Sequence, residues 1–173
     1  MATRRQAREW ALQLLVQLDL NPDTNLAGVL DAFWGQLADL ERERLADDPR
    51  ATPVLTGDPA DASATAALAE ARAFAETRVR GVLGARAAID ALLETRLRNW
   101  ALYRLGTVER NVLRLGIWEL QNCPDIPPPI VINESVDLAK FFSETKSGRF
   151  VNAILDTYAK ECRRAQQEGV FTP

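Results

Sequence analysis

The fold is decided by the stretch PPPIVINESVDLAKFFSETKSGRFVNAILD, residues 127–156. Its pattern predicts two amphipathic helices joined by a short polar loop. The three prolines indicate an extended approach, and Asn133 is a favourable N-cap for the first helix, which ends near Phe142. Ser147 is the expected N-cap of the second helix. The apolar stripe of that second helix consists of Val151, Ile154, Leu155, Tyr158 and Cys162.

The polar loop between these helices places cations beside an aromatic ring. Lys146 and Arg149 lie within three residues of each other, and Phe150 follows directly. Two cations next to a ring suit a nucleic-acid backbone and an unstacked base. A solvated connection between two helices is the alternative interpretation of such a loop.

The other long segments are also predicted to be helical, because apolar residues recur at helical spacing and no strand-length alternation or internal repeat is found. The fold class is therefore all-α. Gly81 and Gly84 indicate a break within the alanine-rich part of the chain. The expected helices are about Thr3–Leu20, Thr24–Leu45, a segment from after Ser63 to about Val82, Ala85–Arg98, and a helix capped by Thr107.

The first helix carries a cluster of arginines. Arg4, Arg5 and Arg8 are neighbours on a wheel of 3.6 residues per turn. Positive charge at a helix N-terminus opposes the helix dipole, at a cost of a few tenths to about 1 kcal/mol. A phosphate partner explains this placement, and a solvated helix end is the alternative. The net charge of −3 does not exclude such a partner, because the local potential steers a polyanion.

Residues 46–63, ADDPRATPVLTGDPADAS, have a different composition from the rest. The segment is rich in aspartate and proline and has no apolar periodicity. We interpret it as a flexible acidic loop inserted into the domain. A plain surface insertion is favoured over a mimic of RNA that shields the basic patch.

The composition, with 47% hydrophobic and 26% charged residues, is that of a soluble globular chain. No apolar run reaches the length of a membrane span and no secretory signal is found, so we expect a cytoplasmic protein. The chain has no histidine, and Cys123 and Cys162 lack CxxC spacing. We expect no metal and no cofactor, and we interpret both cysteines as structural or incidental thiols.

An enzymatic function is disfavoured by the missing motifs. There is no P-loop, no GxGxxG after a strand, no GxSxG and no histidine for proton transfer. Glu119 falls on the apolar face of its helix, where a carboxylate could act as an acid or base. Because no nucleophile or metal ligand accompanies it, we expect Glu119 to be structural.

Three segments together resemble the NusB family of transcription antitermination factors. They are RRQAREWALQLL at the N-terminus, NWALYRLGTVERNVLRLGIWEL in the middle, and the stretch that begins at Pro127. They occur in the same order as in the family, and together they cover roughly half of the chain. The resemblance implies an all-helical fold of about seven helices in two subdomains, with residues 1–173 forming a single RNA-binding domain.

The resemblance also implies a role in processive antitermination, especially of ribosomal RNA operons. Family members pair with NusE, a small-subunit ribosomal protein, bind the boxA element of nascent RNA, and join RNA polymerase and other Nus factors. The arginine motif RRQAR and the polar loop match the family's RNA surface, and the segment VERNVLRL matches its NusE contact. The implied RNA-binding residues are Arg4, Arg5, Arg8, Lys146, Ser147, Arg149 and Phe150, and the implied partner-binding residues are Glu109, Arg110 and Arg114.

Two rival interpretations remain at this level. The N-terminal RNA-binding domain of ribosomal RNA cytosine-5 methyltransferases also resembles NusB, but Cys123 has no glycine-rich strand-turn-helix nearby, so we expect RNA binding without methylation. The other rival is a helical adaptor or a homodimer that binds protein and leaves the basic face unused. Its support is the wide apolar surface of the first helix, on which Trp10 is expected to be exposed.

Overall fold

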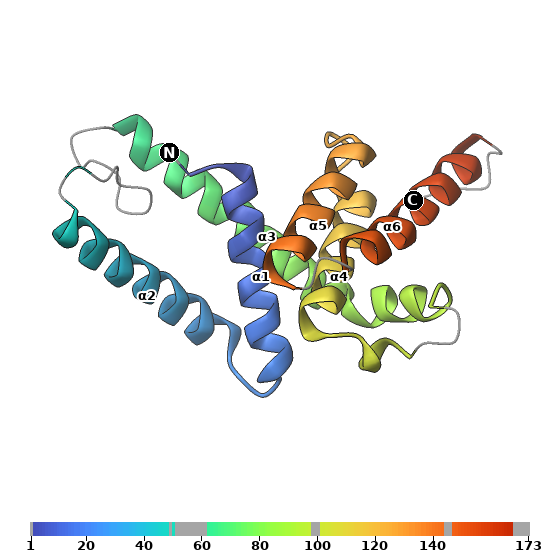
Figure 1. Cartoon of the computed structure of the whole chain (residues 1–173), viewed down its shortest axis with the longest axis horizontal. Helices are drawn as coiled ribbons and strands as arrows, with labels where there is room; N and C mark the ends of the chain where they lie inside the picture. The colour runs from blue at the N-terminus through green and yellow to red at the C-terminus, as the bar shows by residue number, and fades with distance from the viewer. Residues whose placement is uncertain (1, 49, 51–61, 98–100, 144–146, 168–173) are drawn as a thin grey trace. The chain divides into compact units, whose positions relative to one another are not determined.

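The computed structural model describes the whole chain except residues 1, 49, 51–61, 98–100, 144–146 and 168–173 (Figure 1). The described residues form helices and connections without any strand, which confirms the predicted all-α class. The helices in chain order are α1 (Arg4–Leu20), α2 (Leu26–Asp47), α3 (Ala62–Glu94), the 3-10 helix η1 (Leu102–Arg104), α4 (Thr107–Asn122), α5 (Pro128–Phe142) and α6 (Ser147–Gln167).

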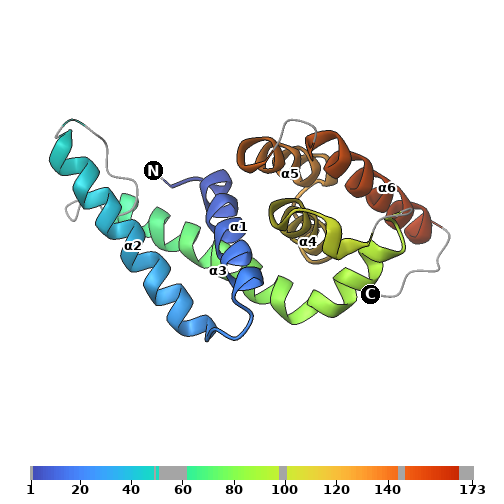
Figure 2. The same ribbon diagram turned by 60° about the horizontal axis from the view of Figure 1, so that its bottom comes forward.

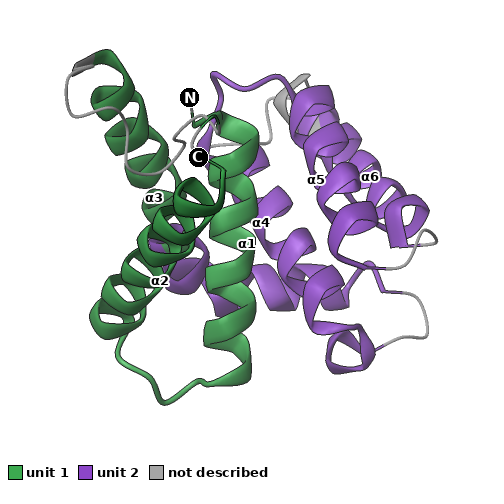
Figure 3. Cartoon of the chain, turned by 60° about the vertical axis from the view of Figure 1, so that its left-hand side comes forward, with its two compact units in different colours: residues 1–79 green, residues 80–173 purple. Residues whose placement is uncertain are grey.

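The chain divides into two compact units (Figure 3). Unit 1 comprises Met1–Val79 and unit 2 comprises Arg80–Pro173, so the long helix α3 contributes to both. The acidic segment predicted as a loop is helical at both ends, because α2 extends to Asp47 and α3 begins at Ala62. The remainder of that segment lies outside the described residues, apart from the C-cap Asp48 and the turn residue Arg50.

Unit 1 is built on aromatic packing between α1 and α2. The Trp10 ring meets the Trp34 ring edge-on, with 5.4 Å between centroids, and the Trp34 indole N–H donates to Glu76 Oε1 at 2.9 Å. Only 2% of Trp10 is exposed. The prediction of an exposed Trp10 is therefore wrong, because the second apolar face of α1 is covered. The same core contains Ala7, Ala11, Leu14, Leu15, Val29, Leu30 and Phe33.

Unit 2 contains a bundle in which α4, α5 and α6 pack against one another (Figure 2). The helical stripe predicted for α6 supplies part of its interior, which includes Val112, Leu115, Val131, Leu138, Val151, Leu155 and Tyr158. Ile154 and Cys162, which the same stripe contains, are only half-buried. Cys123 and Cys162 are free thiols.

Helix α5 begins earlier than predicted. Pro127 is its N-cap and Pro128 is its first residue, whereas Asn133 lies inside the helix. The first turn of a helix leaves its N–H groups unpaired, so prolines lose nothing there, and their fixed φ favours the helical start. The proline run therefore opens the helix instead of delaying it.

The predicted break at Gly81 and Gly84 is also wrong, since α3 continues through both residues. A glycine inside a helix costs only about 1 kcal/mol relative to alanine. At Gly81 a Cβ would collide with the indole of Trp118, so the missing side chain lets Trp118 pack directly against α3. This glycine serves helix packing within unit 2.

The remaining helix starts follow the sequence closely. Thr3 caps α1 by accepting the Gln6 backbone N–H at 3.2 Å, and Asn25 caps α2. At α4 the cap is Gly106, and Thr107, the predicted cap, is the first helical residue. Every helix among the described residues is too short or too polar for a membrane span. The described residues also contain no cluster of three or more metal-binding side chains.

Candidate nucleic-acid interface

The arginines of α1 differ in solvent exposure. Arg4 and Arg5 lie in the first turn and are exposed, because the Thr3 cap places this turn at the helix end. Arg8, one turn further along, is only 4% exposed. The predicted cluster therefore contains two accessible guanidinium groups and one that is packed inside the chain.

A phenylalanine of α3 organises these arginines within unit 1. The guanidinium carbon of Arg8 lies 5.3 Å from the centroid of the Phe74 ring, and that of Arg4 lies 5.9 Å from it. Arg78 stacks on the same ring at 3.1 Å and donates to the Phe74 carbonyl oxygen at 3.2 Å. A ring attracts a cation without neutralising its charge. Three guanidinium groups therefore gather around one aromatic side chain.

The side chain of Arg5 is exposed at the start of α1. Its Nε lies 3.7 Å from Glu9 Oε1, and 53% of the Arg5 side chain is exposed. Surface ion pairs of this kind contribute about 0–1 kcal/mol, so they exchange easily for another anion. Arg5 is therefore well placed for a phosphate.

In unit 2 the predicted loop residues fall at the start of α6. Ser147 is the first helical residue, Arg149 is exposed and Phe150 is half-buried. Lys146 lies outside the described residues. Phe150 therefore offers only part of its ring for stacking, whereas Arg149 is fully available to a phosphate.

Sequence reasoning missed a further cation at this position. A Cβ on Gly148 would lie 3.0 Å from both Cγ and Cε of Lys140, so the lysine stem runs across the first turn of α6. Lys140 is exposed and belongs to α5. Its signal was Gly148 itself, since a glycine one residue after a helix start often marks a close approach of another group.

An exposed aromatic side chain was also missed. Phe141 is 72% exposed and meets the neighbouring Phe142 ring edge-on, with 4.8 Å between centroids. The pattern of apolar residues gave no reason to single out Phe141. An exposed phenylalanine next to Lys140 in the chain offers an aromatic surface to solvent at the end of α5.

The predicted partner residue Glu109 is bonded to the start of α6. Its Oε1 accepts from the Ser147 hydroxyl at 2.7 Å and from the Ser143 hydroxyl. Burial raises the pKa of Glu109, but the hydrogen bonds from Ser143, Ser147 and its own backbone N–H together outweigh burial, and the net pKa is lowered below its usual value. Gly106 leaves the space for this carboxylate, because a Cβ there would collide with Glu109 Oε2.

The other two predicted partner residues are less accessible. Arg110 is half-buried and donates to the Leu105 carbonyl oxygen at 3.3 Å. Arg114 is only 3% exposed and forms a two-pronged pair with Asp90, with donor–acceptor distances of 2.7 and 2.8 Å. A direct partner contact by Arg114 is not supported, because the guanidinium is committed to the interior of unit 2. Glu119 is 1% exposed, as expected for a structural carboxylate.

Comparison with known proteins places this arrangement in context. The model of the NusB family matches residues 5–160. The transcription antitermination protein NusB of Sorangium cellulosum is 35% identical over 97% of this chain and 99% of its own length. The corresponding protein of Myxococcus xanthus is 38% identical over 92% of this chain and 96% of its own length.

Solved structures agree with these relatives. A structure of T. maritima NusB is 30% identical, with a TM-score of 0.69, and the alignment covers 92% of each chain. A crystal structure of the antitermination factors NusB and NusE in complex with dsRNA is also similar. It is 27% identical, has a TM-score of 0.63, and is matched over 91% of this chain and 96% of that chain.

Proposed function

Since this chain belongs to the NusB family, we propose that it is a transcription antitermination factor that binds boxA RNA of nascent ribosomal RNA transcripts together with NusE. The complex would then join RNA polymerase and other Nus factors. The observation that carries this proposal is the similarity along almost the whole chain to antitermination proteins named NusB. The similar complex of NusB, NusE and dsRNA supports the choice of partners.

The proposed RNA contacts are the accessible cations of each unit. Arg5 would bind a phosphate in unit 1, and Arg4 would contact the RNA next to it. Arg149 would bind a phosphate in unit 2, where Ser147 is also proposed to contact the RNA. Lys146, which lies outside the described residues, is proposed as a further contact. Neutralised phosphates release counterions, which gives affinity a steep dependence on salt. Phe150 would stack on a base and add selectivity. Arg8 would act through its neighbours, because its guanidinium is buried against Phe74.

The proposed NusE surface is the first turn of α4. Glu109 and Arg110 are both accessible enough to contact a protein partner, whereas Arg114 would support them by fixing α4 to Asp90 of α3. Ser147 donates to Glu109 and also belongs to the proposed RNA surface. A single hydrogen-bonded group would therefore connect the two binding surfaces of unit 2.

The proposed activity is binding without catalysis, in the cytoplasm, and without a cofactor. Membership of the NusB family supports the absence of catalysis, because a protein that binds RNA and another protein needs no reactive group. The whole chain, residues 1–173, would act as one RNA-binding domain, with the acidic segment 46–63 as an inserted loop.

The deciding experiment is the binding of the purified chain to a short boxA-like RNA, with and without NusE, across a salt titration. Affinity that strengthens with NusE and falls steeply with salt is the expected result. A folded chain that binds RNA in neither condition would contradict the proposal. Retained binding of NusE alone would then favour the protein adaptor, and a homodimer would be detected by its mass in solution.

A further inference from the structure

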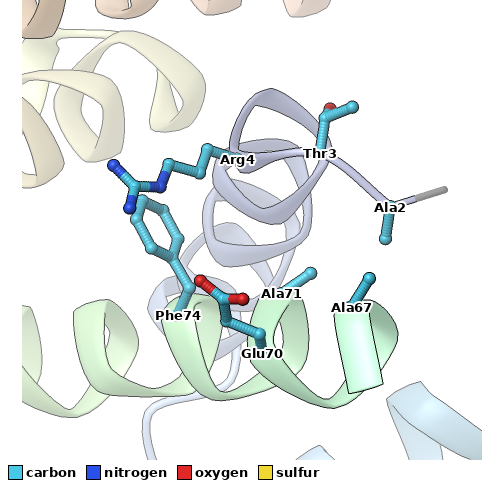
Figure 4. A pocket seen from close by; sticks show the side chains of 7 residues that line it. All are labelled: Ala2, Thr3, Arg4, Ala67, Glu70, Ala71 and Phe74. Carbon is cyan, nitrogen blue, oxygen red and sulfur yellow. The ribbon is translucent and has the colours of Figure 1, made fainter. Parts of the chain in front are cut away.

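A small hollow lies in unit 1 between the start of α1 and one face of α3 (Figure 4). Its volume is about 100 Å³. That equals roughly three water molecules at about 30 Å³ each, so the hollow suits one small flat group. Its lining consists of Ala2, Thr3, Arg4, Ala67, Glu70, Ala71 and Phe74.

One end of the hollow is aromatic and cationic. Arg4 extends over the Phe74 ring, with 5.9 Å from the guanidinium carbon to the ring centroid (Figure 4). Phe74 is half-buried, so part of its ring is open. A phenylalanine ring and a guanidinium plane are the two groups on which an unpaired nucleobase stacks.

The α3 side of the hollow has small side chains and one acid. Residues 67, 70, 71 and 74 share a face of α3, because they are three or four positions apart. Ala67 and Ala71 leave room above the helix, and Glu70 projects beside the Phe74 ring (Figure 4). Within the described residues, Glu70 forms no hydrogen bond or ion pair, and the only interaction of Arg4 is with the ring. Both polar groups are therefore available to a ligand.

We propose that this hollow binds a single unstacked cytosine of the RNA, which rests on the proposed RNA-binding function. The base would lie against the Phe74 ring, with Arg4 at its edge. The Glu70 carboxylate would accept a hydrogen bond from the exocyclic amino group, and the Arg4 guanidinium would donate to the acceptors of the same base edge. Glu70 is thereby a residue that determines specificity, in addition to the arginines that hold phosphates.

The chemistry of the lining distinguishes cytosine from the other bases. The small volume favours a single-ring pyrimidine over a purine. Uracil offers a carboxylate only its N3–H, and the carbonyl oxygens on both sides of that N–H repel the Glu70 oxygens. Cytosine presents an amino group instead, which a carboxylate accepts. A phosphate in the hollow is disfavoured, because its charge would be repelled by Glu70.

The test measures binding of the full chain with NusE to oligocytidylate and to oligouridylate of equal length, by fluorescence anisotropy. The wild-type chain is expected to bind oligocytidylate about five- to tenfold more tightly, as for one good base contact. In Glu70→Ala this preference should fall to about one. Affinity for oligouridylate should hold or rise, because a negative charge near the phosphates is removed.

Two further variants separate base recognition from general effects. Phe74→Leu keeps an apolar side chain but removes the stacking ring, so both oligomers should bind about fivefold or more weakly. Glu43→Ala, an exposed acid of α2 in the same unit, removes the same charge outside the hollow and should leave the preference unchanged. Circular dichroism confirms that each variant is folded.

Each outcome has a separate meaning. If the wild-type chain binds both oligomers equally, or if Glu70→Ala keeps the preference, the cytosine site is wrong while RNA binding stands. If the folded wild-type chain binds neither oligomer nor a boxA-like RNA, the proposed function fails together with the site. If Glu43→Ala and Glu70→Ala lose the preference for cytosine equally, the preference comes from net charge, and the cytosine site is wrong.

Discussion

The arginine at the start of α1 and the arginine in the middle of α4 are held by different chemistry. Arg4 is exposed and lies over the Phe74 ring, whereas Arg114 is buried and is held by both carboxylate oxygens of Asp90. A ring leaves the charge of a cation in place, and a carboxylate cancels it. The type of partner therefore separates an arginine available for binding RNA from an arginine that holds two helices together.

The carboxylate side of this comparison is tested by Arg114→Met. The variant removes the two-pronged partner of the partly buried Asp90 and leaves it the more distant Arg86, whose Nε lies 3.9 Å from Asp90 Oδ2. We therefore expect the free energy of unfolding to fall by about 2 kcal/mol. Urea denaturation followed by circular dichroism measures this loss. The control is Arg104→Met, an exposed arginine of unit 2 whose replacement should change stability by less than about 0.5 kcal/mol. Equal effects of the two changes would mean that the Asp90 pair contributes nothing.

The exposed side of the comparison is tested by Arg5→Ala and Arg4→Ala. Both are expected to weaken RNA binding. Arg5→Ala should lower the slope of log affinity against log salt by about 0.7, the value for one phosphate contact to single-stranded RNA, and Arg4→Ala should lower it by less, because Arg4 contacts a base. Binding is measured at four or more salt concentrations. Unchanged slopes in both variants would remove the start of α1 from the RNA interface.

Arg8→Ala sharpens the same comparison, because Arg8 is buried beside the Phe74 ring. We expect weaker RNA binding through the loss of packing around Phe74, with a slope closer to that of the wild-type chain than in Arg5→Ala. The same salt titration provides the measurement. A drop in slope equal to that of Arg5→Ala would show that Arg8 reaches a phosphate directly.

The Glu109 carboxylate is held in a third way, by hydrogen bonds from two serine hydroxyls. In Gly106→Ala the new Cβ would meet the Glu109 carboxylate and displace it from Ser147. Losing these hydrogen bonds at a partly exposed site should cost about 1 kcal/mol of stability and weaken NusE binding. Thermal unfolding and a NusE titration measure the two effects. The collision is absent at Gly84, so Gly84→Ala serves as the control. It should raise stability by up to about 1 kcal/mol, because alanine is favoured over glycine inside a helix, and it should leave NusE binding unchanged.

The smallest expected effect is the dependence of stability on pH through Glu109. Its pKa in the folded chain is below the usual value of 4.5, so folding favours the ionised form. The stability that Glu109 contributes is fully present above about pH 5 and is lost as the pH falls through its folded pKa. Between pH 7 and pH 3, the free energy of unfolding should therefore fall less steeply in Glu109→Gln than in the wild-type chain. Parallel curves for the two proteins would contradict the lowered pKa.

Much of the helical architecture was predictable, because it depends on local rules. The bounds of α1 agree with the sequence to within one residue, since Thr3 caps the helix and the chain reaches Asn21-Pro22 after it. The start of α5 was missed although the signal is local, because prolines open helices as readily as they end them. The continuity of α3 was missed for another reason, since only the position of Trp118 explains Gly81.

The site divides in the same way. Residue type and spacing gave the arginine motif, the cationic loop and the all-α family pattern, because these depend on the order of residues along helices. Which arginine is exposed was decided by packing, since Arg8 and Arg114 look like Arg4 in the sequence but are covered by neighbouring helices. The same holds for Lys140 beside Gly148 and for the hollow at Glu70. Sequence alone determined the helices and the family, and tertiary structure decided which side chains remain free to bind, because burial is a property of segments that meet only after folding.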